Sequence, residues 1–297
     1  MKVTNYIVTD VFSTRSLAGN PLAVVFDDFG MSTEIMQSIA REFNLSETTF
    51  VQRRDPAIEA EEGVRVRIFT TQEELPFAGH PTLGTASILR TEAPETVRDN
   101  EVRLALNVGT VPVRFTPDSA YGEMTQKDPE FKTELDRETV ASLIGLHADD
   151  LNPHHAPQVV STGTAFAIVL LNSADALARL HVAEQEASPW LRKRGARWFY
   201  VLAPTGTATT GEPDFRARMQ FNGGEDPATG SAAGCAISYL VQREIVQSDR
   251  RIHLRQGVEM LRPSEIFLTA HRDTAKVSNV RVGGSTVLVA KGQLFLP

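Results

Sequence analysis

The sequence contains very little cysteine and no long apolar run. Cys235 is the single cysteine among 297 residues, which excludes an internal disulfide and any mechanism that needs two thiols. The longest apolar run, around residues 164–171, is far too short to span a bilayer. A signal peptide is not indicated, because Asp10 interrupts the first apolar stretch and no small-residue cleavage site follows. We therefore expect a soluble, cytoplasmic protein that does not insert into membranes.

Positive charge is also scarce. The 30 Lys and Arg residues are outnumbered by 37 Asp and Glu residues, which gives a net charge of −7. Nucleic acids and anionic membrane surfaces are bound by clustered Lys and Arg side chains, so we expect neither as a partner. The P-loop and the dinucleotide-binding fingerprint are missing too, since neither glycine order occurs in the sequence. We therefore expect no nucleotide cofactor.

Two glycine-containing segments are conspicuous in this composition. They read ELPFAGHPTLG at residues 74–84 and EDPATGSAAGCA at residues 225–236. Each follows a predicted strand and opens a helix of small residues, and Gly79 in the first copy matches Gly230 in the second. Backbone N–H groups at a helix start are free to bind anions. We therefore predict two related halves whose helix starts face one small ligand.

A helix is predicted after Ser32, before the first of the two glycine-containing segments. Ser32 is a suitable N-cap, and Ile35, Ile39 and Phe43 recur every four residues, which is typical of one buried helix face. Asn44 is expected to end this helix.

Alternating strands and helices are predicted in both halves, and this length favours two domains over one. The predicted strands are residues 6–12, 21–26, 45–51, 64–69, 158–161, 165–171, 198–203 and 215–221, and the further helices are residues 137–144 and 174–181.

Five segments follow one another in order between about residue 10 and residue 264. They read DVFSTRSLAGNPLAVV, NLSETTFV, ELPFAGHPTLGTA, GGEDPATGSAAG and QGVEMLRPS. This ordered set resembles the PhzF family, which is named for the isomerase of phenazine biosynthesis and is related to diaminopimelate epimerase. The C-terminal stretch GGSTVLVAKGQLFLP fits as well, so the resemblance covers essentially the whole chain.

The resemblance implies an α+β fold of two similar domains, each a mostly antiparallel or mixed sheet rolled around a central helix, with the active site in the interdomain cleft. We place the first domain at residues 1–116, with residues 278–297 returning to it, and the second at residues 117–277. Pro, Asp and Gly are frequent at residues 116–134, which favours a boundary there. Residues 282–297 predict a closing hairpin. We also expect a homodimer.

The family also implies where the chemistry lies. The related epimerases carry a cysteine before each helix, and the corresponding positions here are Ala78 and Thr229. Neither can act as a thiol base, which excludes cysteine-dependent epimerisation. Glu47 resembles the glutamate that the family uses as proton shuttle, a role that burial favours because it raises the pKa of a carboxyl. His80, directly after Gly79, could stabilise a developing enolate or hold a polar group of the substrate.

Further positions match the family, each with a simpler structural alternative. Asp226 and Ser231 match its second acidic and hydroxyl positions, although an N-cap role would explain either residue. Gly79 and Gly230 would let backbone N–H groups approach a substrate carboxylate, although helix–sheet packing would also require small residues. Cys235 is expected to pack as a small apolar residue, and no metal site is expected.

Together these features predict an isomerase that moves a proton within a small carboxylate-bearing substrate through Glu47, without a cofactor. Two alternatives remain: a two-base epimerase or racemase using Glu47 and Asp226, and a catalytically silent binding or scaffold protein of the same fold.

Overall fold

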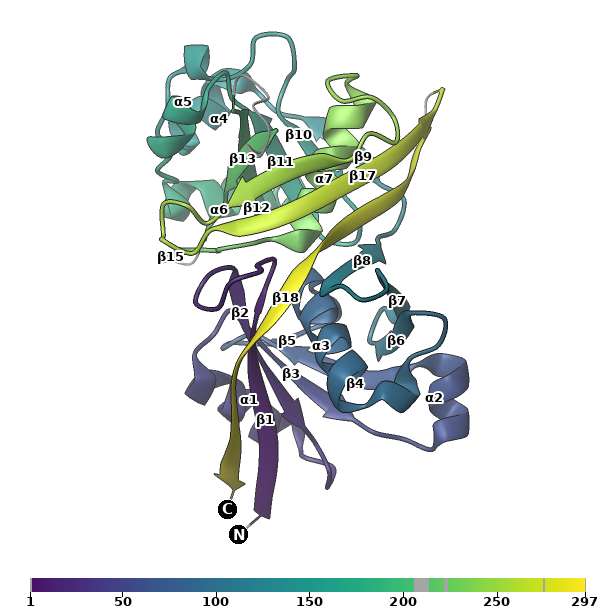
Figure 1. The fold of residues 1–297 in the computed structure, drawn as a ribbon. Helices are drawn as coiled ribbons and strands as arrows, with labels where there is room; N and C mark the ends of the chain where they lie inside the picture. Colours follow the sequence, from purple (N-terminus) through teal and green to yellow (C-terminus); the bar gives the residue numbers. More distant parts are fainter. Residues whose placement is uncertain (1, 206–213, 222–223, 275, 297) are drawn as a thin grey trace. The chain divides into compact units, whose positions relative to one another are not determined.

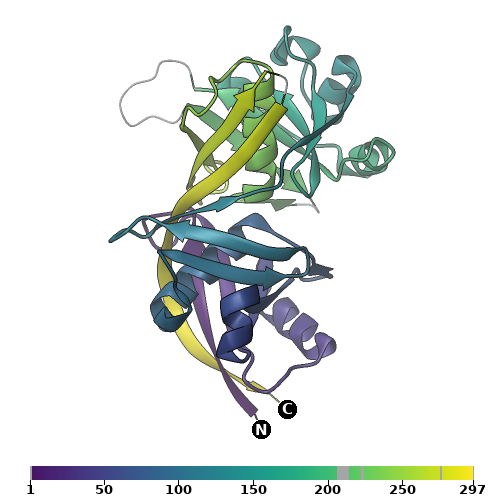
Figure 2. The ribbon, with the colours of Figure 1, turned by 90° about the vertical axis from the view of Figure 1, so that its right-hand side faces the viewer.

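The computed structural model describes residues 2–205, 214–221, 224–274 and 276–296 (Figures 1 and 2). It divides into a first unit, Met1–Thr125 with Gly283–Pro297, and a second unit, Gln126–Val282. The sequence placed the division after residue 116. The contacts place it after Thr125, because residues 121–125 form a strand that pairs antiparallel with residues 109–115 of the first unit.

The first unit contains most of its strands before its central helix. In chain order its elements are β1 (Lys2–Val11), β2 (Asn20–Phe26), α1 (Thr33–Phe43), β3 (Glu47–Gln52), α2 (Pro56–Glu62), β4 (Val64–Phe69), β5 (Glu74–Leu75), α3 (Gly79–Glu92), η1 (Pro94–Thr96), β6 (Glu101–Leu106), β7 (Gly109–Phe115) and β8 (Tyr121–Thr125).

The sheet of the first unit closes on itself around α3. Its strands follow the order β1-β2-β3-β4-β6-β7-β8, and the last strand of the chain, β18 (Lys276–Leu296), neighbours β8 and also pairs with β1. Helix α3 packs against β1, β2, β3, β6, β7 and β8 and is buried over most of its length (Figure 1). The rolled sheet with a central helix is therefore confirmed for this unit.

The C-terminal stretch is one long strand, so the predicted hairpin at residues 282–297 is wrong. The β1–β18 ladder pairs Lys2 with Leu296 and Val11 with Thr286, and Figure 2 shows the start of β1 beside the end of β18. Gly283, Gly284 and Gly292 all lie inside this strand. Gly292 allows close packing instead, because a Cβ there would lie 2.5 Å from the hydroxyl oxygen of Tyr6.

Helix α1 has the ends that the sequence predicts but a slightly rotated buried face. The Ser32 side chain accepts a hydrogen bond from the Ile35 N–H, and Asn44 ends the helix in the left-handed conformation. Met36, Ile39 and Ala40 are buried, whereas Ile35 is exposed. The recurrence of apolar residues every four positions predicted that Ile35 is buried. The neighbouring residue Met36 is buried instead, in the core cluster that contains Phe50 and Phe69.

The second unit is also built from both strands and helices. Its elements are β9 (Glu130–Glu134), α4 (Arg137–Leu143), η2 (Ala148–Asp150), β10 (Gln158–Ser161), β11 (Ala165–Leu170), α5 (Ala174–Ala178), α6 (Glu184–Arg192), β12 (Trp198–Pro204), β13 (Phe215–Arg218), β14 (Gln220–Phe221), β15 (Gly224–Glu225), α7 (Gly230–Gln242), β16 (Ile252–Gln256) and β17 (Ser264–Asp273).

The two units repeat one order of strand pairing. In the first, β1 to β7 pair in turn as antiparallel, parallel, antiparallel, parallel and antiparallel when β5 is set aside. In the second, β10, β11, β12, β13, β16 and β17 pair in the same sequence. Each second parallel pair is connected through the central helix, α3 or α7, as parallel pairing requires a crossover. The two glycine segments thus begin equivalent helices.

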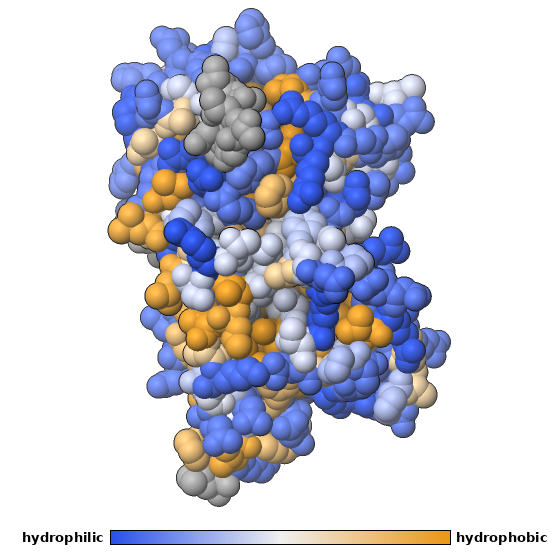
Figure 3. Space-filling model, in the orientation of Figure 1, coloured by the Kyte–Doolittle hydropathy of each residue, from blue (hydrophilic) through white to orange (hydrophobic). Residues whose placement is uncertain are grey.

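The surface in Figure 3 is mainly hydrophilic with separate hydrophobic patches. Among the described residues, the most exposed large apolar side chains are Leu261 at 85% in the second unit and Leu17 at 73% in the first. Among the described residues, no helix is long and apolar enough to cross a membrane.

Candidate active site

Helix α3 begins where the sequence predicts, directly after Ala78. Ala78 is the N-cap in an extended conformation, and its side chain offers no capping hydrogen bond. Gly79 and His80 are the first two helical residues, and Pro81 follows without loss because a first-turn N–H has no acceptor within the helix. The first turn of α3 therefore carries the backbone N–H groups of Gly79 and His80 and none at Pro81.

Glu47 and His80 come together in the first unit. Glu47 begins β3, and its Oε2 lies 3.6 Å from Nε2 of His80. The carboxyl side chain is 16% exposed and the imidazole 4% exposed. On its other side, His80 Nδ1 lies 3.2 Å from Nδ2 of Asn20, a fully buried amide at the start of β2. We call Glu47, His80, Gly79 and Asn20 the first-unit cluster.

The imidazole of His80 is neutral in this environment. Burial lowers the pKa of His80 to about 3. The Asn20 Nδ2 group can only donate, so Nδ1 of His80 accepts and the ring proton sits on Nε2, on the side of Glu47. Nε2 is buried and has no hydrogen-bond partner within the described part of the chain. The cluster therefore presents one N–H donor beside one carboxyl group.

The depressed pKa of His80 predicts a pH dependence of stability. An unfolded histidine titrates near pH 6.5, whereas the pKa of buried His80 is about 3. Between these two pH values, residue 80 is protonated in the unfolded chain and neutral in the folded protein. Stability from this group is present above about pH 6.5 and falls with decreasing pH by roughly 1.4 kcal/mol per unit.

The comparison with His80→Gln isolates this effect from the other histidines. Urea unfolding should show that the native chain loses about 2 kcal/mol more than His80→Gln between about pH 7 and about pH 5. Equal losses in the two proteins would mean that His80 titrates normally in the folded state.

The second unit holds Asp226, Gly230 and Ser231 at the start of α7. Thr229 is the N-cap, and Gly230 and Ser231 are the first two helical residues, Gly230 buried and Ser231 half-buried. Asp226 is 7% exposed, and its Oδ2 accepts a hydrogen bond of 2.6 Å from the Thr229 hydroxyl. Neither Asp226 nor Ser231 occupies the N-cap position, so the N-cap alternative is wrong for both. We call Asp226, Thr229, Gly230 and Ser231 the second-unit cluster.

The turn that carries Asp226 is clamped by an ion pair. Arg218, on β13, binds both carboxylate oxygens of Glu225, with Nη2 to Oε2 at 2.6 Å and Nε to Oε1 at 2.9 Å. Arg218 is 7% exposed and also donates to the backbone oxygens of Leu177 and Ala178. Because Glu225 directly precedes Asp226, this bidentate pair fixes where the turn begins.

Gly257 holds the other side of this turn. Its φ is +76°, and a Cβ there would lie 2.4 Å from the Arg262 backbone oxygen and 2.7 Å from that of Pro227. Gly30 is a matched control, since its φ is +71° and a Cβ there would meet nothing within 4 Å.

Gly257→Ala is expected to destabilise the protein more than Gly30→Ala. Both substitutions carry the left-handed backbone penalty of roughly 1–2 kcal/mol, and Gly257→Ala adds an overpacking cost of about 1–3 kcal/mol. Urea unfolding of both variants measures the difference. Equal losses would show that the Pro227 backbone does not constrain residue 257.

Cys235 takes no part in either cluster as a reactive thiol. It is fully buried in α7, and burial raises its pKa to about 11. Its Sγ lies 3.5 Å from the Thr162 hydroxyl. The thiol therefore stays protonated, and the expectation that it packs as a small apolar residue is confirmed.

Sequence reasoning missed several amides that hold these clusters, among them Asn20 and Gln126. Asn20 was assigned only to a turn, yet its amide contacts the His80 ring. Gln126, in the segment assigned to the domain boundary, donates from Nε2 to the Gly230 backbone oxygen at 2.9 Å and accepts from Thr162 at Oε1. Asn20 lies inside a motif that carried the family resemblance, which was the available signal for it.

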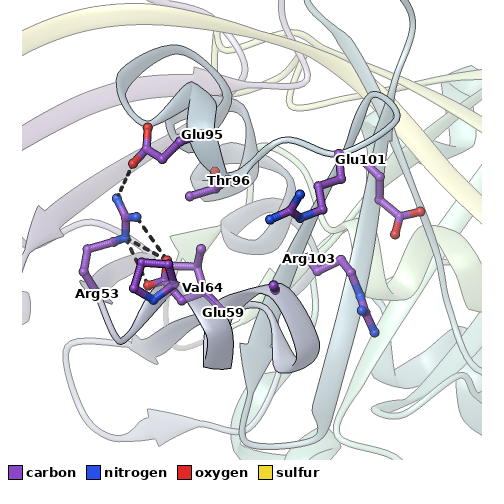
Figure 4. Close-up of a pocket in the computed structure, with 10 residues that line it drawn as sticks. Arg53, Glu59, Val64, Glu95, Thr96, Glu101 and Arg103 are labelled. Atoms are coloured by element: carbon purple, nitrogen blue, oxygen red, sulfur yellow. Dashed lines mark hydrogen bonds and ion pairs between the residues drawn. The ribbon is translucent and has the colours of Figure 1, made fainter.

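A separate pocket of about 80 Å³ lies in the first unit (Figure 4). One of its arginines is already paired, since Arg53 binds Glu59 at 3.0 Å and Glu95 at 2.9 Å. Arg53 follows the C-terminal end of β3, whereas Glu47 begins that strand. The pocket therefore lies by the opposite end of β3 from Glu47, and the first-unit cluster remains the candidate active site.

Comparison with known proteins shows the family of this chain. The family model PhzC-PhzF, described as phenazine biosynthesis-like protein, matches residues 9–292. The chain is 36% identical over 307 residues to an uncharacterized isomerase of Mesorhizobium japonicum, with 100% of both chains covered. It is 34% identical over 299 residues to trans-2,3-dihydro-3-hydroxyanthranilate isomerase of Pseudomonas aeruginosa, with 98% of this chain and 99% of the relative covered.

A solved structure extends the agreement to the fold. The PhzF-family phenazine biosynthesis protein of Bacillus anthracis superposes with a TM-score of 0.86 at 24% identity, covering 100% of both chains. The shared fold and the names of these relatives together define a class of isomerases. Within this class, the chain belongs to the phenazine biosynthesis-like PhzF family, and it is an isomerase of that family.

Proposed function

We propose that this enzyme moves a proton within a small, cyclic or enol-like carboxylate substrate, with Glu47 as the proton shuttle and without a cofactor. The observation that carries the proposal is the Nε2–H of His80. It is buried, has no hydrogen-bond partner in the described chain, and lies 3.6 Å from the Glu47 carboxyl. A buried donor without a partner is costly unless a ligand completes it.

The first-unit cluster supplies complementary groups for this chemistry. Glu47 removes a proton from a substrate carbon and returns it to another carbon of the same molecule. The negative charge that develops on the substrate accepts the Nε2–H of His80, and the neutral imidazole suits this role because it does not first protonate Glu47. The backbone N–H groups at Gly79 are suited to a carboxylate, as helix starts are to anions.

The second-unit cluster contains a second acidic residue, Asp226. Asp226 is buried, bonded to Thr229, and positioned at the start of α7. We propose that Gly230 and Ser231 hold a substrate carboxylate or hydroxyl group, and that Asp226 orients the substrate. If Asp226 were instead a second base, the enzyme would be an epimerase, and the product would differ from the substrate only in configuration.

The relatives indicate a substrate class. The Pseudomonas aeruginosa relative is named for trans-2,3-dihydro-3-hydroxyanthranilate, a ring that carries a carboxylate. We propose ring carboxylates with a hydrogen next to a double bond as the substrate class, because loss of that hydrogen gives a delocalised anion. The single cysteine supports action in the cytoplasm, where structural disulfides are rare.

A panel of such ring carboxylates incubated in D₂O and followed by NMR tests the proposal. We expect at least one member to be converted to a constitutional isomer by the native chain and by Glu61→Gln, which changes an exposed glutamate of α2. Conversion that is unchanged in Glu47→Gln would contradict the proposed shuttle.

A further inference from the structure

Gln256 is a fully buried amide at the end of β16 in the second unit. A buried amide has two donor and two acceptor positions to satisfy. Its Nε2 donates to the Asp226 backbone oxygen at 2.8 Å and to the Thr229 hydroxyl at 2.9 Å. Its Oε1 accepts from the Thr229 backbone N–H at 3.1 Å and from the Tyr200 hydroxyl at 2.9 Å. All four positions are therefore used.

The orientation of this amide follows from its backbone partners. The Thr229 N–H can only donate, so it faces the oxygen of Gln256, and the Asp226 carbonyl can only accept, so it faces the nitrogen. The Tyr200 hydroxyl must then donate to the same oxygen. Burial first, and then the charge of Asp226, raise the pKa of Tyr200 well above its ordinary value, so Tyr200 remains a protonated donor.

The fixed amide determines the direction of the next hydrogen bond. The Thr229 hydroxyl accepts a hydrogen from Gln256, so its own hydrogen points elsewhere. The two atoms within reach are Oδ2 of Asp226 at 2.6 Å and Sδ of Met219 at 3.2 Å. A carboxylate oxygen is a much stronger acceptor than a thioether, and 2.6 Å is typical of a hydroxyl bound to a carboxylate. The hydroxyl therefore donates to Asp226.

We propose that Gln256 and Thr229 are positioning residues that pass a directed chain of hydrogen bonds to the Asp226 carboxylate and set its orientation for substrate. This inference rests on the proposed function only in assigning Asp226 to the substrate. Thr229 stands where the related epimerases carry a cysteine, and in this chain its hydroxyl is committed to holding Asp226. It has no proton-accepting role of its own.

Thr229→Val and Thr229→Ser form the decisive pair of variants. Valine keeps the shape and removes the hydroxyl, whereas serine keeps the hydroxyl. Infrared spectra, with the Asp226 band identified by subtraction of Asp226→Asn, report the hydrogen bonding of that carboxylate directly. We expect Thr229→Val to shift the band and Thr229→Ser to leave it at the parental position.

Kinetics provide a second readout that a purely structural role would not move in this way. Losing one charge-assisted hydrogen bond should lower kcat of Thr229→Val roughly ten- to hundredfold with KM changed less, and Thr229→Ser should recover most of it. Gln256→Glu replaces the donor at Nε2 with an oxygen. It should shift the Asp226 band in the same way, because the Thr229 hydroxyl then donates to residue 256.

The two proposals can fail separately. If no panel member is converted by the native chain, the proposed function fails, and the infrared comparison still decides the hydrogen-bond chain. If Thr229→Val leaves the Asp226 band in place, or if Thr229→Ser shifts it as far as valine does, the positioning proposal is overturned. Melting temperatures of all variants show that the compared proteins are folded.

Discussion

Glu47→Gln is expected to abolish most proton transfer while leaving substrate binding nearly intact. Glutamine keeps the size of the side chain and can still bond to its neighbours, but it cannot accept a proton from carbon. General acid/base groups contribute about 10²- to 10⁴-fold, and a sole shuttle belongs at the top of that range. Solvent-deuterium exchange at the reacting carbon, measured by NMR, gives the rate, and calorimetric titration with a substrate analogue gives the affinity.

Glu61→Gln is the matched control for this variant. Glu61 is an exposed glutamate of the same unit, so its substitution should leave both exchange and affinity unchanged. If Glu47→Gln exchanges deuterium within about tenfold of the native chain, Glu47 has a structural role. The neighbouring His80, or Asp226 of the second unit, then becomes the first candidate for the base.

Gly79→Val and Gly230→Val are each expected to weaken binding of a small carboxylate substantially. Both glycines are the first residue of a buried central helix, where a branched side chain would cover the backbone N–H groups of that turn. Loss of a charge-assisted hydrogen bond costs roughly 1.5–3 kcal/mol, which is about a ten- to hundredfold loss of affinity. Calorimetric titration of each variant with the same carboxylate measures it.

Gly224→Val provides the comparison for general effects of valine at a glycine. Gly224 is exposed, and a Cβ there would contact only the Phe221 backbone oxygen at 3.8 Å. Its affinity should equal that of the native chain. If Gly79→Val and Gly230→Val lower the melting temperature but leave the affinity unchanged, the two glycines serve helix–sheet packing alone.

The ends of several helices could be predicted from the sequence, because interactions between residues close together in the chain determine them. The Ser32 cap and the Asn44 terminus depend on neighbouring residues, and the structure has both where the sequence indicates them. The start of each central helix after Ala78 and Thr229 was likewise visible as a change from strand to small residues. The repeat between the two glycine segments corresponds to a repeated order of strand pairing.

Long-range pairing could not be predicted in the same way. The C-terminal stretch looks like a hairpin when taken alone, but its partner is β1, and Asp10 pairs with Val287 across nearly the whole chain. The buried face of α1 was predicted wrongly. Packing against β3, in the cluster that contains Phe50, determines that Met36 is buried and Ile35 is not. Spacing along one segment carries no information about such partners.

The candidate site likewise contains residues that the sequence predicted and residues that only the structure identified. Glu47, His80 and Asp226 were found from motifs, and the structure brings Glu47 and His80 together within the first unit. The residues that hold them, Asn20 and Gln256, were not found, although both lie inside the motifs. A buried amide is recognised by its partners, and those of Gln256 lie far from it in sequence.

The position of deuterium in the product of a single turnover in D₂O tests the central claim most directly. Our account predicts a constitutional isomer, with the newly delivered hydrogen or deuterium at a carbon that did not carry it in the substrate, and no such product from Glu47→Gln. A product of unchanged constitution, with deuterium at the original carbon and inverted configuration, would contradict the account and establish a two-base epimerase.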